Sequence, residues 1–182
     1  MLNVVKRVWR RVQEIVPGVG PIQWLCHPET ARQTCDLAGA GQPELQLPEY
    51  AVGADLMKRL LCADMAIVPF NAIREPHDCY ERYSLPSRLT ELLSVGLPVF
   101  SIAGEGTPLA RYLAKNGLGP ACDAEDEVRL ARELAAFILD RDERLAVGLR
   151  ERAFAEREFP LRPFQDYLYA TLERLATSGT QA

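Results

Sequence analysis

Three side chains with complementary chemistry lie close together in the middle of the chain: the hydroxyl of Ser87, the guanidinium of Arg88 and the carboxylate of Glu91. A hydroxyl and a cation suit the oxygens of a phosphate group, and the N–H groups at the start of a helix attract the same charge. Glu91 lies one helical turn after Ser87, and its carboxylate can accept hydrogen bonds from two ribose hydroxyls. This set predicts a site for a nucleoside diphosphate. The alternative is that Glu91 is a surface residue on an exposed helix face.

The elements around this set fit a ligand site. An apolar run over residues 65–68, ended by Pro69, is typical of a strand buried on both faces of a parallel sheet. A polar loop over 71–86 follows, and then a helix over 86–94 with Pro86 in its first turn. Ligands of open parallel sheets bind beyond the carboxyl ends of the strands, so this loop and helix are where a ligand is expected. His27 also follows an expected strand and is interpreted as a plain loop residue.

The rest of the chain alternates strand patterns with helical patterns. This alternation predicts an α/β protein with a mostly parallel sheet, in a single domain over residues 1–176 with a disordered tail over 177–182. The other expected strands are 22–26, 44–47, 98–102 and 118–122, and the other expected helices are 2–16, 29–38, 55–63, 107–116, 126–140, 142–157 and 163–176.

Charged residues are interpreted as solvated in two regions. The basic residues Lys6, Arg7, Arg10 and Arg11 border the apolar face of the first helix. They favour a helix that packs on the sheet with a solvated basic edge over one that lies at a membrane surface. The helices over 126–176 carry many charges at i,i+4 spacing, and Glu151 is one of them. Such charges are typical of solvated faces.

Composition excludes several classes of function. The net charge of −4 argues against non-specific binding to nucleic acid, which needs a basic surface. The five cysteines lack CxxC spacing and only two histidines accompany them, so no metal site is expected. Scattered thiols, the lack of a long apolar stretch and a charged amphipathic start predict a cytoplasmic protein.

Several short motifs occur in an order that resembles a known family. Ala63-Asp64 precedes the strand that Pro69 ends, and Pro86-Ser87-Arg88, Glu91, Gly96, Pro98-Val99 and Gly117-Leu118-Gly119 follow. This is similar to the donor-binding domain of GT-B glycosyltransferases, in particular the retaining class called family four. The likeness covers roughly residues 2–176 and is strongest over 61–120. It implies a Rossmann-like doubly wound parallel sheet with helices on both faces, which binds a nucleoside-diphosphate sugar without a metal or another cofactor.

The resemblance also implies roles for individual residues. Ser87 and Arg88 would hold the diphosphate and Glu91 the ribose, while Glu49 and Tyr50 would lie where relatives hold the nucleobase. Tyr83 stands where many relatives have a glutamate that touches the donor sugar. Ser84-Leu85-Pro86 replaces a glycine-rich loop, and Pro86 has no N–H to offer a phosphate. The catalytic residues are therefore left as unknown.

A larger departure lies at the start of the chain. Relatives begin this domain with a strand and a loop that carries a phosphate-binding lysine, whereas this chain begins at the first helix. In the doubly wound order 3-2-1-4-5-6 that strand is central, so we expect unpaired strand edges. GT-B catalysis takes place between two domains. The chain is therefore expected to be inactive alone, with an N-terminal acceptor-binding domain as its missing partner.

Two other functions fit the same sequence. A non-catalytic interaction module is favoured by Tyr83, Pro86 and the missing strand. A 2-epimerase acting on nucleotide sugars would need acid and base carboxylates in the polar loop, where Glu75, Asp78 and Glu81 lie. Self-association is expected because the last helix carries apolar residues that the missing domain would cover, namely Phe164, Tyr167, Leu168 and Leu172.

Overall fold

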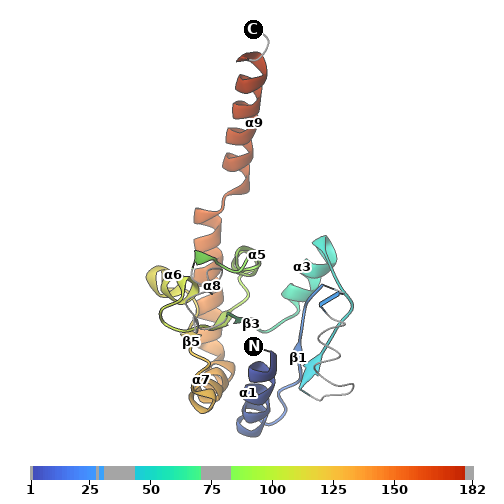
Figure 1. Cartoon of the computed structure of the whole chain (residues 1–182), viewed down its shortest axis with the longest axis vertical. Coiled ribbons are helices and arrows are strands. Elements are labelled where there is room, and N and C mark those ends of the chain that lie inside the picture. Colours follow the sequence, from blue (N-terminus) through green and yellow to red (C-terminus); the bar gives the residue numbers. More distant parts are fainter. Residues whose placement is uncertain (1, 28, 31–43, 71–82, 179–182) are drawn as a thin grey trace.

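The computed structural model describes residues 2–27, 29–30, 44–70 and 83–178 (Figure 1). Residues 31–38 of the helix expected over 29–38 lie outside the described residues, and so do residues 71–82 of the loop expected over 71–86. In chain order the elements are α1 (Leu2–Ile15), β1 (Ile22–Gln23), β2 (Leu45–Gln46), α3 (Gly53–Leu61), β3 (Ala66–Pro69), α5 (Leu89–Val95), β4 (Val99–Ile102), α6 (Pro108–Asn116), β5 (Ala121–Cys122), α7 (Glu127–Leu139), α8 (Arg141–Glu158) and α9 (Leu161–Ser178).

The described strands form two parallel sheets. β1 pairs with β2 in one sheet, and the other has the order β3-β4-β5 with Ala66 opposite Val99 and Ser101 opposite Ala121. The predicted α/β class and parallel pairing are confirmed. Within the described residues no strand joins β1 to β3, which agrees with the gap expected in the sheet.

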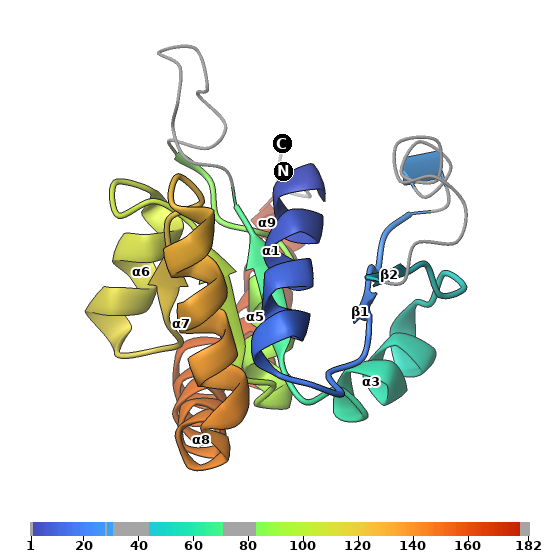
Figure 2. The same cartoon turned by 90° about the horizontal axis from the view of Figure 1, so that it is seen from below.

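Helices cover both faces of the strands. Figure 2 shows α1 and α7 side by side in front of the strands, with α5 and α8 behind them. Because side chains alternate along a strand, Phe100 and Ile102 of β4 pack with α1 and α7, whereas Val99 packs with α5 on the other face. α3 joins the second face through Leu56 and Leu60.

The apolar face of α1 is buried against the sheet. Val8 and Val12 are at most 1% exposed, as their spacing predicts. Arg10 forms an ion pair with Glu44, just before β2. Lys6, expected at a solvated edge, is instead 8% exposed. α1 is thus a helix that packs on the sheet. Within the described residues, no helix is both long and apolar enough to cross a membrane.

Glu151 corrects the expectation that the charges of the last helices are solvated. Its side chain lies on α8 and is 0% exposed. Its carboxylate accepts hydrogen bonds from the N–H of Val99 at 3.2 Å and from the N–H of Gly119 at 3.1 Å. Glu151 therefore joins α8 to the start of β4 and to the turn before β5. Desolvation raises the pKa of this carboxyl to about 8, although both backbone hydrogen bonds act to lower it.

α9 extends away from the rest of the protein (Figure 1). It includes Thr177 and Ser178, which the sequence predicts as part of a tail, and residues 179–182 lie outside the described part. Its large apolar side chains are all exposed: Leu161, Phe164, Tyr167, Leu168, Tyr169, Leu172 and Leu175. The four residues expected to promote self-association are among them.

Candidate functional site

The carboxyl ends of the strands bring several polar and aromatic side chains to one edge of the protein. β1 leads to His27, β2 leads to Glu49 and Tyr50, and the segment after β3 leads to Arg88 and Glu91 at the start of α5. This is the edge at which ligands of open parallel sheets bind. The order of the strands therefore decides which of the predicted site residues become neighbours.

Arg88 and Glu91 form an ion pair in which Nη1 of Arg88 lies 2.8 Å from Oε2 of Glu91. Both side chains are about half exposed, at 55% and 43%. The hydrogen bond from Arg88 to Glu91 is the main cause that raises the pKa of Arg88. Helical spacing predicts Glu91 on the face of Ser87, but the sequence-based interpretation does not include this pair. The i,i+3 spacing of an arginine and a glutamate on a helix is the signal that would have indicated it.

The turn before α5 differs in detail from the expected one. α5 begins at Leu89 rather than Pro86, and the carbonyl of Pro86 accepts a hydrogen bond from the N–H of Leu89 at 3.0 Å. Proline in this turn suits the local backbone because its φ angle is fixed. Ser87 is exposed beside Arg88, and its carbonyl accepts from the hydroxyl of Thr90 at 3.5 Å. Ser87 therefore lies next to Arg88 in the turn before α5.

His27 and Tyr50 form an aromatic pair at the ends of β1 and β2. Their ring centroids are 5.4 Å apart and the rings are inclined by 70°, an edge-to-face contact. His27 thus lies outside helices and strands, as expected from the sequence, and in addition its ring contacts Tyr50. The contact joins residues far apart in the chain, and only the shared edge of the two strands could have suggested it.

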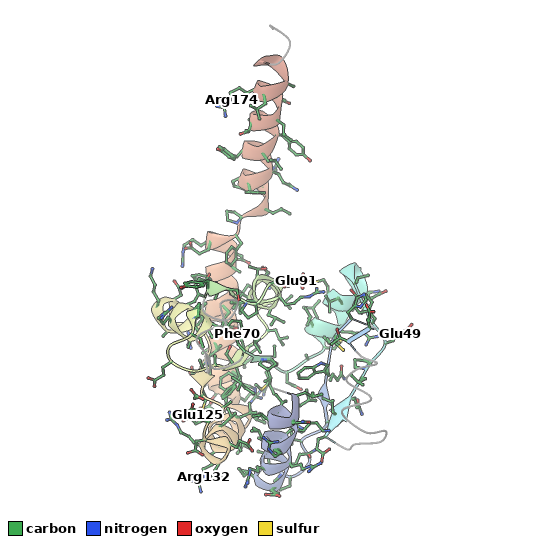
Figure 3. All side chains as sticks on the ribbon, in the orientation of Figure 1. Glu49, Phe70, Glu91, Glu125, Arg132 and Arg174 are labelled. Carbon is green, nitrogen blue, oxygen red and sulfur yellow. The ribbon has the colours of Figure 1, made fainter. Side chains whose placement is uncertain are left out.

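The remaining predicted residues are Glu49, Tyr83 and Ser84. In Figure 3, Glu91 lies on the α3 side of α5, whereas Glu49 lies beyond α3. Tyr83 is 78% exposed, and Ser84 is partly buried and already engaged by another group. The structure thus brings Arg88, Glu91 and Ser87 together and places Glu49 apart from them.

A hollow beside α5 lies at the other end of the strands. It has a volume of about 400 Å³ and is lined by residues of α3, α5 and α8, together with Asp64 before β3 and Pro98 before β4. Because Asp64 and Pro98 mark the amino ends of their strands, this hollow is separate from the Arg88–Glu91 pair. Among the described residues, no group of three or more His, Cys, Asp and Glu side chains is arranged to hold a metal ion.

The comparisons with known proteins add no function to this geometry. No protein-family model matches the chain, and no curated protein matches it either. A function must therefore be inferred from the Arg88–Glu91 ion pair, the neighbouring Ser87 and the His27–Tyr50 pair at the same edge.

Proposed function

We propose that this chain is the donor-binding half of a retaining, GT-B-type glycosyltransferase and binds a nucleoside-diphosphate sugar. The observation that carries the proposal is the exposed Arg88–Glu91 ion pair, at 2.8 Å, beyond the carboxyl end of β3. It places a cation for phosphate oxygens beside a carboxylate for ribose hydroxyls. The resemblance of residues 61–120 to the donor-binding domain supports the same assignment.

The ligand would use both members of the pair. A guanidinium has five N–H donors, so Arg88 can keep its bond to Glu91 and still donate to a diphosphate. The second oxygen of Glu91 is then available to ribose hydroxyls. Tyr50, which is 43% exposed, offers an aromatic surface for a nucleobase. Stabilising the negative charge of the departing diphosphate is how Arg88 and Ser87 would assist sugar transfer.

The arrangement of the elements supports a Rossmann-like doubly wound fold. Parallel strands in the orders β1-β2 and β3-β4-β5 lie between helices on both faces. Sugar transfer would also need an acceptor-binding domain. We therefore expect the chain alone to bind the nucleotide without transferring sugar.

Isothermal titration with UDP, GDP and ADP tests the proposal and identifies the base. We expect one of the three to bind, and Arg88→Ala and Glu91→Ala to weaken that binding about tenfold to a hundredfold, since each removes a charged hydrogen-bonding group. Arg129→Ala is the matched control, because Arg129 forms a similar exposed pair with Glu133 at 2.6 Å on α7. Binding of none of the three nucleotides, or equal weakening by Arg129→Ala, would contradict the proposal.

An interaction module is the second candidate, and the exposed apolar side chains of α9 favour it. Such a surface on a projecting helix is typical of a protein contact. The two candidates are separated by the titration, because only the donor-binding domain should respond to Arg88→Ala. The 2-epimerase alternative depends on Glu75, Asp78 and Glu81, which lie outside the described residues.

A further inference from the structure

α8 carries two exposed leucines that are bounded by arginines on one face of the helix. Arg141, Leu145, Leu149 and Arg152 follow one another at i,i+4, i,i+4 and i,i+3 spacing, which places all four on the same face. Leu145 is 54% exposed and Leu149 is 71% exposed. From Arg141 to Arg152 this face extends over about 16 Å, or about three helical turns.

The same face of α8 borders the hollow beside α5, whose volume is about 400 Å³. Leu61, the last residue of α3, lines this hollow together with Leu145 and Leu149, and it is 69% exposed. The buried side chains of Leu60 and Leu97 line it as well. Exposed leucines from two helices thus gather around one depression, whereas single exposed leucines scattered over a surface need no explanation.

Close packing of α8 on the turn that ends α5 fixes the shape of the hollow. Gly148 and Gly96 both line it, and a Cβ atom added at Gly148 would lie 2.4 Å from the carbonyl oxygen of Gly96. The two backbones therefore touch at a point where a side chain on Gly148 would not fit. The hollow is part of the packed fold, so its walls are in place before any partner binds, which lowers the entropy cost of binding.

The charged side chains that line the hollow are mainly basic. They are Arg141, Arg144 and Arg152, with Asp64 as the carboxylate among the lining residues. Arg144 donates to the last carbonyls of α7 and is engaged in the fold. Arg152 pairs with Glu156 at 3.0 Å, but both side chains are more than half exposed, and such a pair is weak. Arg141 and Arg152 therefore place a cation at each end of the apolar stretch of α8.

We propose that this leucine groove, formed by Leu61, Leu145 and Leu149 with Arg141 and Arg152 at its ends, binds an acidic amphipathic helix of another protein. Apolar side chains of the partner, spaced as on one face of a helix, would pack on the three leucines. Carboxylates about three turns apart on the partner would pair with the two arginines. The groove lies at the amino ends of the strands, so this inference is independent of the proposed function.

A helix suits the groove better than a small molecule or a lipid surface. Leu145 and Leu149 are too exposed to be covered by a ligand held inside the hollow, whereas a helix about 10 Å wide that lies along α8 covers both. Binding to a lipid surface needs an apolar face that enters the bilayer, and a depression between two helices does not present one. The charge at both ends of the groove favours an acidic partner.

The probe is the synthetic peptide Ser-Glu-Glu-Leu-Ala-Gln-Leu-Leu-Ala-Gln-Leu-Ala-Glu-Glu-Ala, labelled with a fluorophore. In helical form its leucines lie on one face and its two pairs of carboxylates are about three turns apart. The matched control peptide has lysine in place of each glutamate. Fluorescence anisotropy measures the affinity of each peptide for the whole chain, and NMR amide shifts locate the site.

We expect the glutamate peptide to bind and to shift the amide signals of Leu61, Gly96 and Leu149, and the lysine peptide to bind at least about tenfold more weakly. Leu149→Glu and Arg141→Glu should each weaken binding of the glutamate peptide at least about tenfold. Both positions are exposed, so the variants should keep the fold. Leu172→Ser, in the exposed apolar face of α9, is the control and should leave binding unchanged.

Failure of the glutamate peptide to bind would overturn the proposal, and so would amide shifts confined to α9. Equal binding of the two peptides would contradict the acidic nature of the partner. Binding to phosphatidylserine vesicles that Leu149→Glu abolishes would identify the groove as a membrane contact. Self-association that the same variant abolishes would identify a second copy of this chain as the occupant. Each of these last two results would count against a helix of another protein.

Discussion

Glu151 gives the protein a pH-dependent stability that follows from its burial. The pKa of its carboxyl is about 8 in the folded protein, above the ordinary value of 4.5 that the unfolded chain would have. Between these values the folded state binds a proton that the unfolded state has released. The free energy of unfolding should therefore fall as the pH rises from about 4.5 to 8, by up to about 1.4 kcal/mol per pH unit.

Urea denaturation at pH 5, 6, 7 and 8 measures this slope. Glu151→Gln should remove most of it, because the amide does not titrate. The same variant should lower stability at pH 5, because its NH₂ group must face one of two backbone N–H donors. Glu156→Gln, at an exposed position of the same helix, serves as the control and should keep the wild-type slope. A slope that survives Glu151→Gln would assign the pH dependence to other groups.

Gly119 is required because the chain passes too close to β4 for any side chain. A Cβ atom at this position would lie 1.9 Å from the carbonyl oxygen of Val99 and 2.9 Å from Oε1 of Glu151. Gly119→Ala should therefore cost at least about 3 kcal/mol, as overpacking against backbone does. Gly106→Ala is the control, since a methyl group added there would meet no atom within 4 Å. Equal thermal stability of the two variants would contradict this explanation.

The residues of the site were predictable to different degrees. Ser87, Arg88 and Glu91 are close in sequence, so helical spacing alone brings them together. The His27–Tyr50 contact and the burial of Glu151 depend on residues distant in sequence, and local spacing holds no information about them. Glu151 has charged neighbours on a helix that also has exposed apolar residues such as Leu149, so its pattern resembles that of a solvated face.

At the scale of elements, α9 should contribute to association rather than to the stability of the rest of the protein. Its large apolar side chains are exposed, between 42% for Leu168 and 70% for Tyr167. Deleting residues 161–182 should shift the melting temperature of the remaining chain by no more than a few degrees. The same deletion should abolish self-association in sedimentation velocity runs at increasing concentration.

Point variants separate the apolar surface of α9 from its length. Phe164→Ser with Leu168→Ser should reduce association as the deletion does, whereas Arg162→Ser, on the same helix, should leave it unchanged. An intact chain that stays monomeric at all concentrations would contradict the prediction, and so would a large loss of stability in the deletion variant.

Most elements follow from local patterns, and the two sheets do not. The apolar spacing of α1 and the apolar run of β3 predict a helix and a strand because each buries its own face. β1 and β2 are shorter than the strands expected over 22–26 and 44–47. Strand pairing fixes strand length, and β1 has a described partner on only one side. Its length therefore depends on a neighbour and not on its own residues.

At the scale of the whole molecule, the candidate site is divided between the two sheets. His27 and Tyr50 follow the β1-β2 sheet, whereas Arg88 and Glu91 follow β3. The described links between the two parts include side-chain packing beneath α1 and between α3 and α5, the Arg10–Glu44 pair, and the hydrogen bond that Nε1 of Trp9 donates to the carbonyl of Gly20. No backbone hydrogen bond joins the sheets within the described residues. Within the described residues, the distance between the two halves of the site is therefore set without a strand that pairs with both sheets.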